Sequence, residues 1–223
     1  MRDVARIVRK YAPNAILHTD AVQAACWVDL REITPLVDAL SLSAHKFGGP
    51  KGVGVMVIKT GKNLEPLIFG GGQERDRRSG THNVSGIIAT AKALEVTDQT
   101  RAEETERVTK LRDRLVDEIR AQVDGVLETV PREHRVPGVA HICFSGLENE
   151  ALLFLLDQAD VYASAASACA SGAMEPSHVL EAMGVERSWS NGALRLSLGH
   201  TTTDAEIDLA VSAIVSAVNQ LRR

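Results

Sequence analysis

The chain has 223 residues, 44% of them apolar, and a net charge of -4 from 25 basic and 29 acidic side chains. This length is enough for one large domain or two modest domains with a buried core. The small negative charge gives no electrostatic basis for binding nucleic acid or an anionic membrane. Because no run of about 18 apolar residues predicts a membrane span, and residues 1–4 do not begin a signal peptide, we expect a cytoplasmic protein.

The first part of the chain is predicted to form an α/β sheet. We expect a short helix over 3–11 and strands over 15–18, 39–43 and 52–58. The last of these is rich in glycine and valine, which is typical of a buried strand. In such sheets the functional side chains follow the strand ends.

The pattern becomes helical from residue 83. One face carries Ile87, Ile88, Ala91 and Leu94. A long amphipathic helix is predicted over 103–123, and we place a domain boundary near residue 101, where that helix is expected to begin. Strands are then predicted over 140–144 and 194–198, and helices over 149–158, 176–183 and 203–221. The last helix has the capping-box pattern Thr-Asp-Ala-Glu at its start.

Three cysteines are widely spaced and follow no Cys-x-x-Cys pattern, so neither a disulfide framework nor a zinc site is predicted. Cys26 and Cys143 lie among apolar residues and are expected to be structural thiols. Cys169 lies among alanines, serines and a glycine, a composition that suits an exposed loop with a reactive thiol.

The strongest functional signal is a lysine that follows a strand, with an acid upstream. Asp20 ends the first apolar run, and Lys46 follows the second within Ser43-Ala44-His45-Lys46. Pyridoxal 5'-phosphate chemistry needs such a set. The amine forms a Schiff base with the aldehyde, the acid keeps the pyridinium nitrogen protonated, and hydroxyl or imidazole donors bind the phosphate.

Six ordered motifs give the chain a family resemblance. They are His18-Thr19-Asp20-Ala21-Val22-Gln23, Ser43-Ala44-His45-Lys46, Gly70 to Arg75 leading into Arg78-Ser79-Gly80-Thr81, Ser167-Ala168-Cys169, Glu175 to Leu180, and Leu194 to Gly199. Together they resemble the cysteine desulfurases of the NifS/IscS type, in the class V aminotransferase group of fold-type I enzymes. The resemblance implies an α/β fold. Residues 1–101 would be the C-terminal half of the large, cofactor-binding domain, and residues 102–223 a smaller α+β domain.

The resemblance also implies how the cofactor is bound. Lys46 would hold pyridoxal 5'-phosphate covalently, Asp20 would pair with the ring nitrogen, and Gln23 would bond the ring hydroxyl. The residues expected to bind the phosphate are Ser43, His45 and, across a homodimer, Thr81.

Two further residues would act on the substrate, L-cysteine. Arg195 would bind its carboxylate, because a planar guanidinium matches a planar anion. Cys169 would attack the substrate sulfur and become a persulfide, from which a sulfur-acceptor protein such as an iron-sulfur scaffold would take the sulfur.

The chain departs from the family pattern in two ways. Ala166 stands where the family usually has a glycine before Ser-Ala-Cys, and the family's chains are roughly twice as long. We therefore expect a fragment, a truncated gene product, or one piece of an enzyme with a separate N-terminal half. Two alternatives remain open: a non-catalytic module that provides dimer or acceptor contacts, and a related lyase or aminotransferase, which would not need the thiol of Cys169.

Overall fold

The computed structural model describes residues 1–165 and 177–223 of the chain. These residues form two compact units, Met1–Ala102 and Glu103–Arg223. One continuous helix, α4 (Val84–Gln122), contributes to both units, so the expectation that a helix begins near residue 101 is wrong. The assignment of the units to a cofactor-binding domain and a small domain stays a prediction. Within the described ranges, no helix is both long and apolar enough to cross a membrane.

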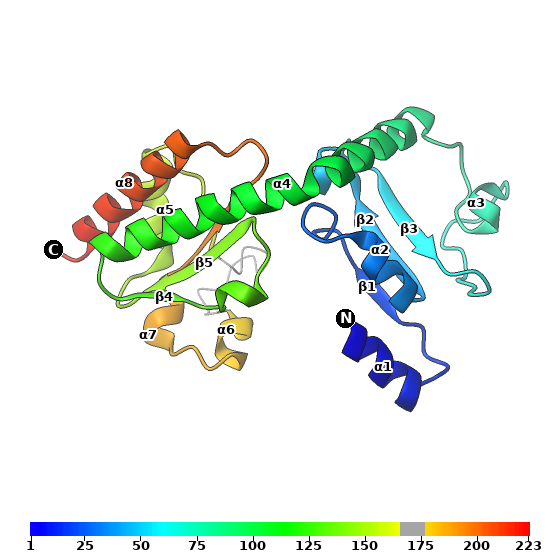
Figure 1. Ribbon diagram of the computed structural model, residues 1–223, viewed down its shortest axis with the longest axis horizontal. Coiled ribbons are helices and arrows are strands. Elements are labelled where there is room, and N and C mark those ends of the chain that lie inside the picture. Colours follow the sequence, from blue (N-terminus) through cyan, green and yellow to red (C-terminus); the bar gives the residue numbers. More distant parts are fainter. Residues whose placement is uncertain (166–176) are drawn as a thin grey trace. The chain divides into compact units, whose positions relative to one another are not determined.

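The first unit is built on a three-stranded mixed sheet (Figure 1). Strand β1 (His18–Asp20) runs parallel to β2 (Ala39–Ser43), and β2 runs antiparallel to β3 (Gly54–Ile58). The other elements of this unit are α1 (Arg2–Tyr11), α2 (Leu30–Ile33), the 3₁₀ turns η1 (Thr34–Leu36) and η2 (Ala44–Phe47), α3 (Gln73–Asp76) and the first part of α4.

The core of this unit lies on one face of β2. Leu40 and Leu42 point into it and are joined by Phe47 from the turn after the strand, while Ala93 and Leu94 of α4 pack against them. Because side chains alternate along a strand, the residues between them point to the opposite face. That second face carries His18 and Asp20 of β1 and Ser41 and Ser43 of β2.

Three expectations for this unit need correction. Strand β1 spans His18–Asp20 rather than residues 15–18, because its pairing with β2 begins at His18 and runs through Asp20. Strand β3 is not buried: its side chains are exposed on both faces of the sheet, and Met56 is 51% exposed. Of the face predicted on α4, Ile87 and Ile88 are exposed, whereas Leu94 packs against the core.

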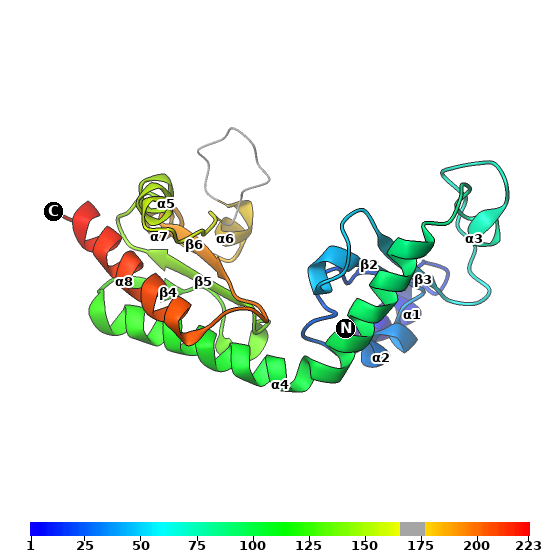
Figure 2. The same ribbon diagram turned by 90° about the horizontal axis from the view of Figure 1, so that it is seen from above.

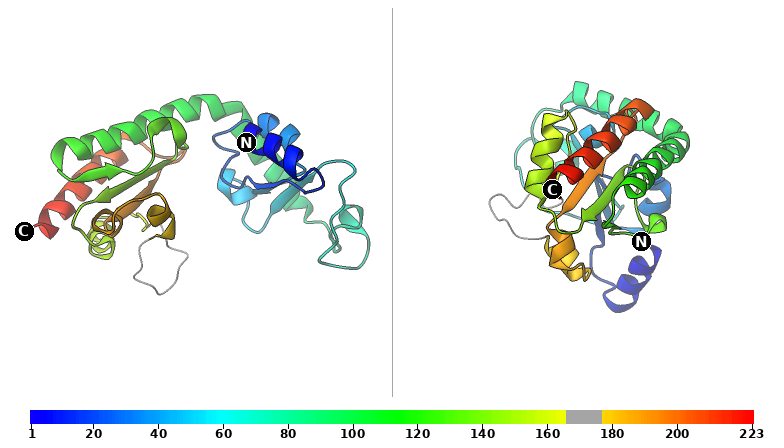
Figure 3. Two further views of the ribbon diagram at one scale, coloured as in Figure 1. Left: turned by 90° about the horizontal axis from the view of Figure 1, so that it is seen from below. Right: turned by 90° about the vertical axis from the view of Figure 1, so that its left-hand side faces the viewer.

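The second unit is an antiparallel sheet with helices on both sides. It contains β4 (Val126–Glu128), β5 (Val139–Phe144) and β6 (Ala193–Ser197), with β5 in the centre. The views in Figures 2 and 3 show α5 (Asn149–Gln158), α8 (Asp204–Leu221) and α4 lying across one face. On the other side are α6 (His178–Ala182) and α7 (Arg187–Ser190). The 3₁₀ turn η3 (Arg132–His134) precedes β5.

The alternation of β5 separates the two faces of this sheet. Ala140, Ile142 and Phe144 are fully buried, as expected for the face that the long helices cover. Cys143 points the other way and packs with Leu180 of α6. The structure confirms an α/β chain whose C-terminal part is α+β.

The last helix begins as its sequence predicts. The side chain of Thr203 accepts a hydrogen bond from the amide of Glu206, and the Glu206 carboxylate accepts one from the amide of Thr203 at 2.7 Å. This reciprocal cap satisfies two amides that would otherwise lack a partner at the helix start.

Candidate functional site

The parallel pairing of β1 and β2 brings the predicted cofactor residues to one edge of the sheet. Asp20, the last residue of β1, lies opposite Ser41, and β2 ends two residues later at Ser43. The carboxyl ends of parallel neighbours meet at the same edge, which is where α/β sheets bind ligands. Lys46 follows in η2, directly beyond the end of β2.

The Asp20 carboxylate is oriented by the backbone that follows it. Its Oδ1 accepts a hydrogen bond of 3.0 Å from the amide of Val22. On the same face of the sheet, His18 Nε2 and Ser41 Oγ are 2.7 Å apart. No role for His18 or Ser41 is predicted from sequence, although the two-residue spacing of His18 and Asp20 in a strand places them on one face.

Two of the predicted phosphate ligands are in contact with each other. Ser43 Oγ and His45 Nδ1 are 2.9 Å apart, so one is the donor and the other the acceptor. The side chains of His45 and Lys46 are exposed, whereas the next residue, Phe47, is buried in the core. Gly48 ends the turn at a φ of 82°, in the left-handed region that glycine adopts without strain.

Gln23 and Thr81 complete the predicted cofactor residues. Gln23 is exposed in the turn that follows Asp20. Thr81 is exposed in the loop between α3 and α4, where the Gly80 amide donates to Gln73 Oε1 at 2.9 Å. No hydrogen bond within the described residues joins Thr81 to the other predicted ligands. The structure therefore brings together the ends of β1 and β2 but leaves Thr81 on a separate loop.

The donor set at this edge fits the chemistry of pyridoxal 5'-phosphate. It offers an exposed primary amine on Lys46, a carboxylate on Asp20, and a hydroxyl paired with an imidazole at Ser43 and His45. These groups match an aldehyde, a protonated ring nitrogen and a phosphate, in that order.

Arg195 belongs to the second unit and is half-buried on β6. Its backbone exchanges two hydrogen bonds with Ser164, of 2.8 and 3.2 Å. Residues 166–176 follow shortly after Ser164, and the predicted nucleophile Cys169 lies among them, outside the described residues. Pro176, at the expected start of α6, also lies outside them.

His141 is a polar residue beside Arg195 that the sequence analysis missed. It is the cross-strand partner of Arg195, and its Nδ1 is 2.8 Å from Thr129 Oγ1. Its Nε2 is buried without a hydrogen-bond partner. Burial, with the nearby Arg195 guanidinium as the lesser cause, holds the pKa of His141 below its usual range, so the imidazole is neutral near pH 7. A lone histidine within an apolar run gave no signal of this contact.

The two described cysteines are poor nucleophiles. Cys143 is fully buried, and burial raises its pKa to about 11. Burial also raises the pKa of Cys26, against a smaller opposing effect of Arg101. Since the thiolate is the reactive form, both thiols are expected to be unreactive at neutral pH, as their sequence context predicted.

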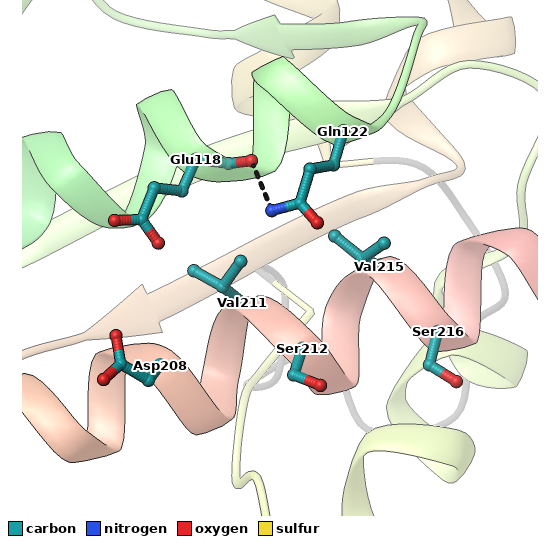
Figure 4. Close-up of a pocket in the computed structure, with 7 residues that line it drawn as sticks. All are labelled: Glu118, Gln122, Asp208, Val211, Ser212, Val215 and Ser216. Atoms are coloured by element: carbon teal, nitrogen blue, oxygen red, sulfur yellow. Dashed lines mark hydrogen bonds between the residues drawn. The ribbon is translucent and has the colours of Figure 1, made fainter.

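A shallow groove of the second unit lies away from all of these residues. It runs between α4 and α8, as Figure 4 shows. Its lining residues are Glu118, Gln122, Asp208, Val211, Ser212, Val215 and Ser216. Gln122 Nε2 donates to the Glu118 carbonyl at 3.1 Å within the same helix. The lining has two acids and two serines but no lysine, so it does not offer the amine that pyridoxal 5'-phosphate needs.

Comparison with known proteins gives one consistent family. The aminotransferase class-V family matches residues 1–209 of the chain. The cysteine desulfurase IscS of Clostridium botulinum strain Hall is 42% identical over 211 residues, which are 94% of this chain and 53% of that protein. The IscS-like cysteine desulfurase of Mycobacterium tuberculosis is 42% identical over 208 residues, covering 93% and 53%. The chain thus spans about half the length of these relatives.

Solved structures agree with the sequence matches. A NifS-like protein superposes with a TM-score of 0.87 at 37% identity, over 99% of this chain and 57% of that one. The NifS-like protein of Rickettsia africae superposes with a TM-score of 0.83 at 26% identity, covering 98% and 57%. The family as a whole implies use of pyridoxal phosphate. The chain belongs to the class-V aminotransferase family and, within it, is similar to the cysteine desulfurases of the NifS/IscS type.

Proposed function

We propose that this chain provides part of a pyridoxal phosphate-dependent cysteine desulfurase, which converts L-cysteine to L-alanine and passes the sulfur to an acceptor protein. One observation carries the proposal: β1 and β2 run in parallel and end together, which places Asp20 and the Lys46 turn at one edge of a sheet. The proposal concerns the assembled enzyme, because the relatives are about twice as long as this chain.

In this proposal Lys46 would hold the cofactor through its amine, Asp20 would accept a hydrogen bond from the protonated ring nitrogen, and Gln23 would bond the ring hydroxyl. The phosphate is bound by Ser43, His45 and, from the partner subunit of a homodimer, Thr81. When bound, the cofactor withdraws electrons from the substrate Cα, which allows the α-proton to leave. A carboxylate that keeps the ring nitrogen protonated strengthens this withdrawal.

The sulfur step uses two residues of the second half of the chain. Arg195 binds the carboxylate of L-cysteine in a bidentate manner. The Cys169 thiolate attacks the substrate sulfur; an S–S bond forms, the Cβ–S bond breaks, and its electron pair stays with the carbon skeleton. Protonation at carbon gives L-alanine, and Cys169 keeps the sulfur as a persulfide. The raised pKa values of Cys26 and Cys143 support Cys169 as the attacking thiol.

The direct test is borohydride reduction of the assembled enzyme mixed with pyridoxal 5'-phosphate, followed by peptide mapping of this chain. The label is expected on Lys46, and Lys46→Ala is expected to abolish the absorbance of the bound aldehyde. Lys51→Ala is the matched control, because Lys51 is an exposed lysine five positions further along. If other lysines of Lys46→Ala carried as much label as Lys46 does in the wild type, the assignment would be refuted.

Cofactor binding and persulfide formation on Cys169, measured together, separate the alternatives. A chain that binds no cofactor in any assembly would instead be a non-catalytic module for dimer or acceptor contacts. A chain that binds cofactor but leaves Cys169 without persulfide in the assembled enzyme would be a related lyase or aminotransferase. The proposal also includes a homodimer, an acceptor protein and a cytoplasmic location.

A further inference from the structure

The turn that carries Lys46 is held by side chains from two other segments of the first unit. The thiol of Cys26 donates to the Lys46 carbonyl at 3.3 Å. The hydroxyl of Thr97, on α4, donates to the next carbonyl, that of Phe47, at 3.2 Å. The carbonyls at the end of a helical turn have no partner within the turn, so these two donors supply bonds that the turn itself cannot make.

The remaining contacts of the turn are within its own backbone. The Ala44 carbonyl accepts hydrogen bonds from the amides of Gly48 and Gly49. Ala44 and Phe47 are buried in the core, and a Cβ on Gly49 would lie 2.9 Å from the Ala44 Cβ. The backbone of Lys46 is therefore fixed from both sides while its amine stays exposed.

Helix α4 also holds the segment that follows Asp20. Arg101 Nε donates to the Ala25 carbonyl at 3.0 Å, next to Cys26. Thr97 and Arg101 are four residues apart and therefore share one face of the helix. This face contacts both the Lys46 turn and the segment after Asp20. The proposed reaction needs a fixed distance between these two segments.

We infer that Cys26 and Thr97 are positioning residues that set the location of the Lys46 backbone relative to Asp20. The inference rests on the proposed function, since that function names Lys46 as the cofactor-binding residue. Neither residue touches cofactor or substrate. A fixed backbone limits the positions that the amine samples, and orientation of this kind favours reaction at one lysine over its neighbours.

The test measures which lysine of this chain is labelled by pyridoxal 5'-phosphate and borohydride in the assembled enzyme, as the ratio of label on Lys46 to label on Lys51. We expect Cys26→Ala and Thr97→Val each to lower this ratio by about 5-fold, as expected for the loss of one neutral hydrogen bond. Thr97→Ser keeps the hydroxyl and should retain the wild-type ratio.

Thr100→Val is the matched control, because the Thr100 hydroxyl bonds the Val96 carbonyl of its own helix at 3.1 Å and does not contact the turn.

A second readout is amide hydrogen exchange over residues 44–49, which should accelerate in Cys26→Ala and Thr97→Val but not in the control. If Thr97→Val does not fold, Cys26→Ala, which removes one sulfur atom, decides the question.

Two results would overturn the inference. If both variants keep the wild-type labelling ratio and the wild-type amide hydrogen exchange over residues 44–49, the positioning role alone is refuted. An assembled wild-type enzyme that labels Lys46 no faster than Lys51 refutes the proposed function, and the positioning role with it.

Discussion

His141 on β5 and Arg195 on β6 are direct cross-strand partners, so their side chains extend from the same face of the sheet in the second unit. The imidazole is bonded to Thr129 on one side and has a buried, unpaired nitrogen on the other. Burial is the main reason why the neutral form is favoured, and a protonated His141 would also place a second positive charge beside the guanidinium.

The first prediction concerns acid stability. Because the folded chain lowers the pKa of His141, the unfolded chain takes up the proton first as the pH falls. The stabilising contribution is therefore fully present above the ordinary histidine pKa of about 6.5 and is lost as the pH falls through that value to the folded pKa. His141→Asn should flatten this part of the pH dependence.

The measurement is urea unfolding between about pH 8 and about pH 5. His134→Gln is the control, since His134 is exposed in η3. An equal slope for wild type and His141→Asn would contradict the prediction.

The second prediction concerns thiol reactivity. With a pKa of about 11, Cys143 has a thiolate fraction at neutral pH that is about 100-fold smaller than that of an ordinary thiol. Alkylation of the folded chain should therefore be fastest at Cys169, with Cys26 slower and Cys143 reacting only after unfolding. Mass spectrometry of a time course identifies the order, and rapid labelling of Cys143 in the folded chain would contradict it.

The third prediction concerns the persulfide. In the assembled enzyme, Cys169→Ser should stop transfer of labelled sulfur from L-cysteine to this chain and leave cofactor binding unchanged, because the thiol acts only after cofactor and substrate are bound. Cys143→Ala is the matched control and should still accept sulfur. Labelled sulfur on Cys26 or Cys143 in the Cys169→Ser variant would show that the assignment of the nucleophile is wrong.

The fourth prediction concerns Asp20. Removal of its charge in Asp20→Asn should weaken binding of pyridoxal 5'-phosphate by about 10-fold or more, as expected for the loss of a charge-assisted hydrogen bond to the ring nitrogen. A cofactor titration monitored by absorbance measures the affinity of each variant. Asp3→Asn, on the exposed side of α1, is the control, and equal affinities for the two variants would refute the role of Asp20.

The fifth prediction concerns the start of α8. Thr203→Ala removes both the hydroxyl acceptor and its bond to Glu206, so the free energy of unfolding should fall by about 1 kcal/mol. Ser212→Ala, at an exposed position within the same helix, should leave stability nearly unchanged. Equal urea midpoints for the two variants would contradict the importance of the cap.

Local sequence determined the features that depend on neighbours along the chain. The strand Ala39–Ser43 and the helix Asn149–Gln158 have the bounds that their patterns predict, and the capping box of Thr203 forms as expected. The family resemblance also follows from sequence, since ordered motifs need no coordinates. These features rest on periodicity, backbone preference and bonds within a few residues.

Tertiary structure alone decided which distant residues meet. Parallel pairing set Asp20 opposite Ser41, and the same sheet left β3 at an edge, although its composition suits a buried strand. The contacts of Cys26 with the Lys46 carbonyl and of His141 with Arg195 join residues 20 and 54 positions apart. Short-range patterns carry no information on such pairs, because strand order and the packed face of a helix depend on burial summed over the whole unit.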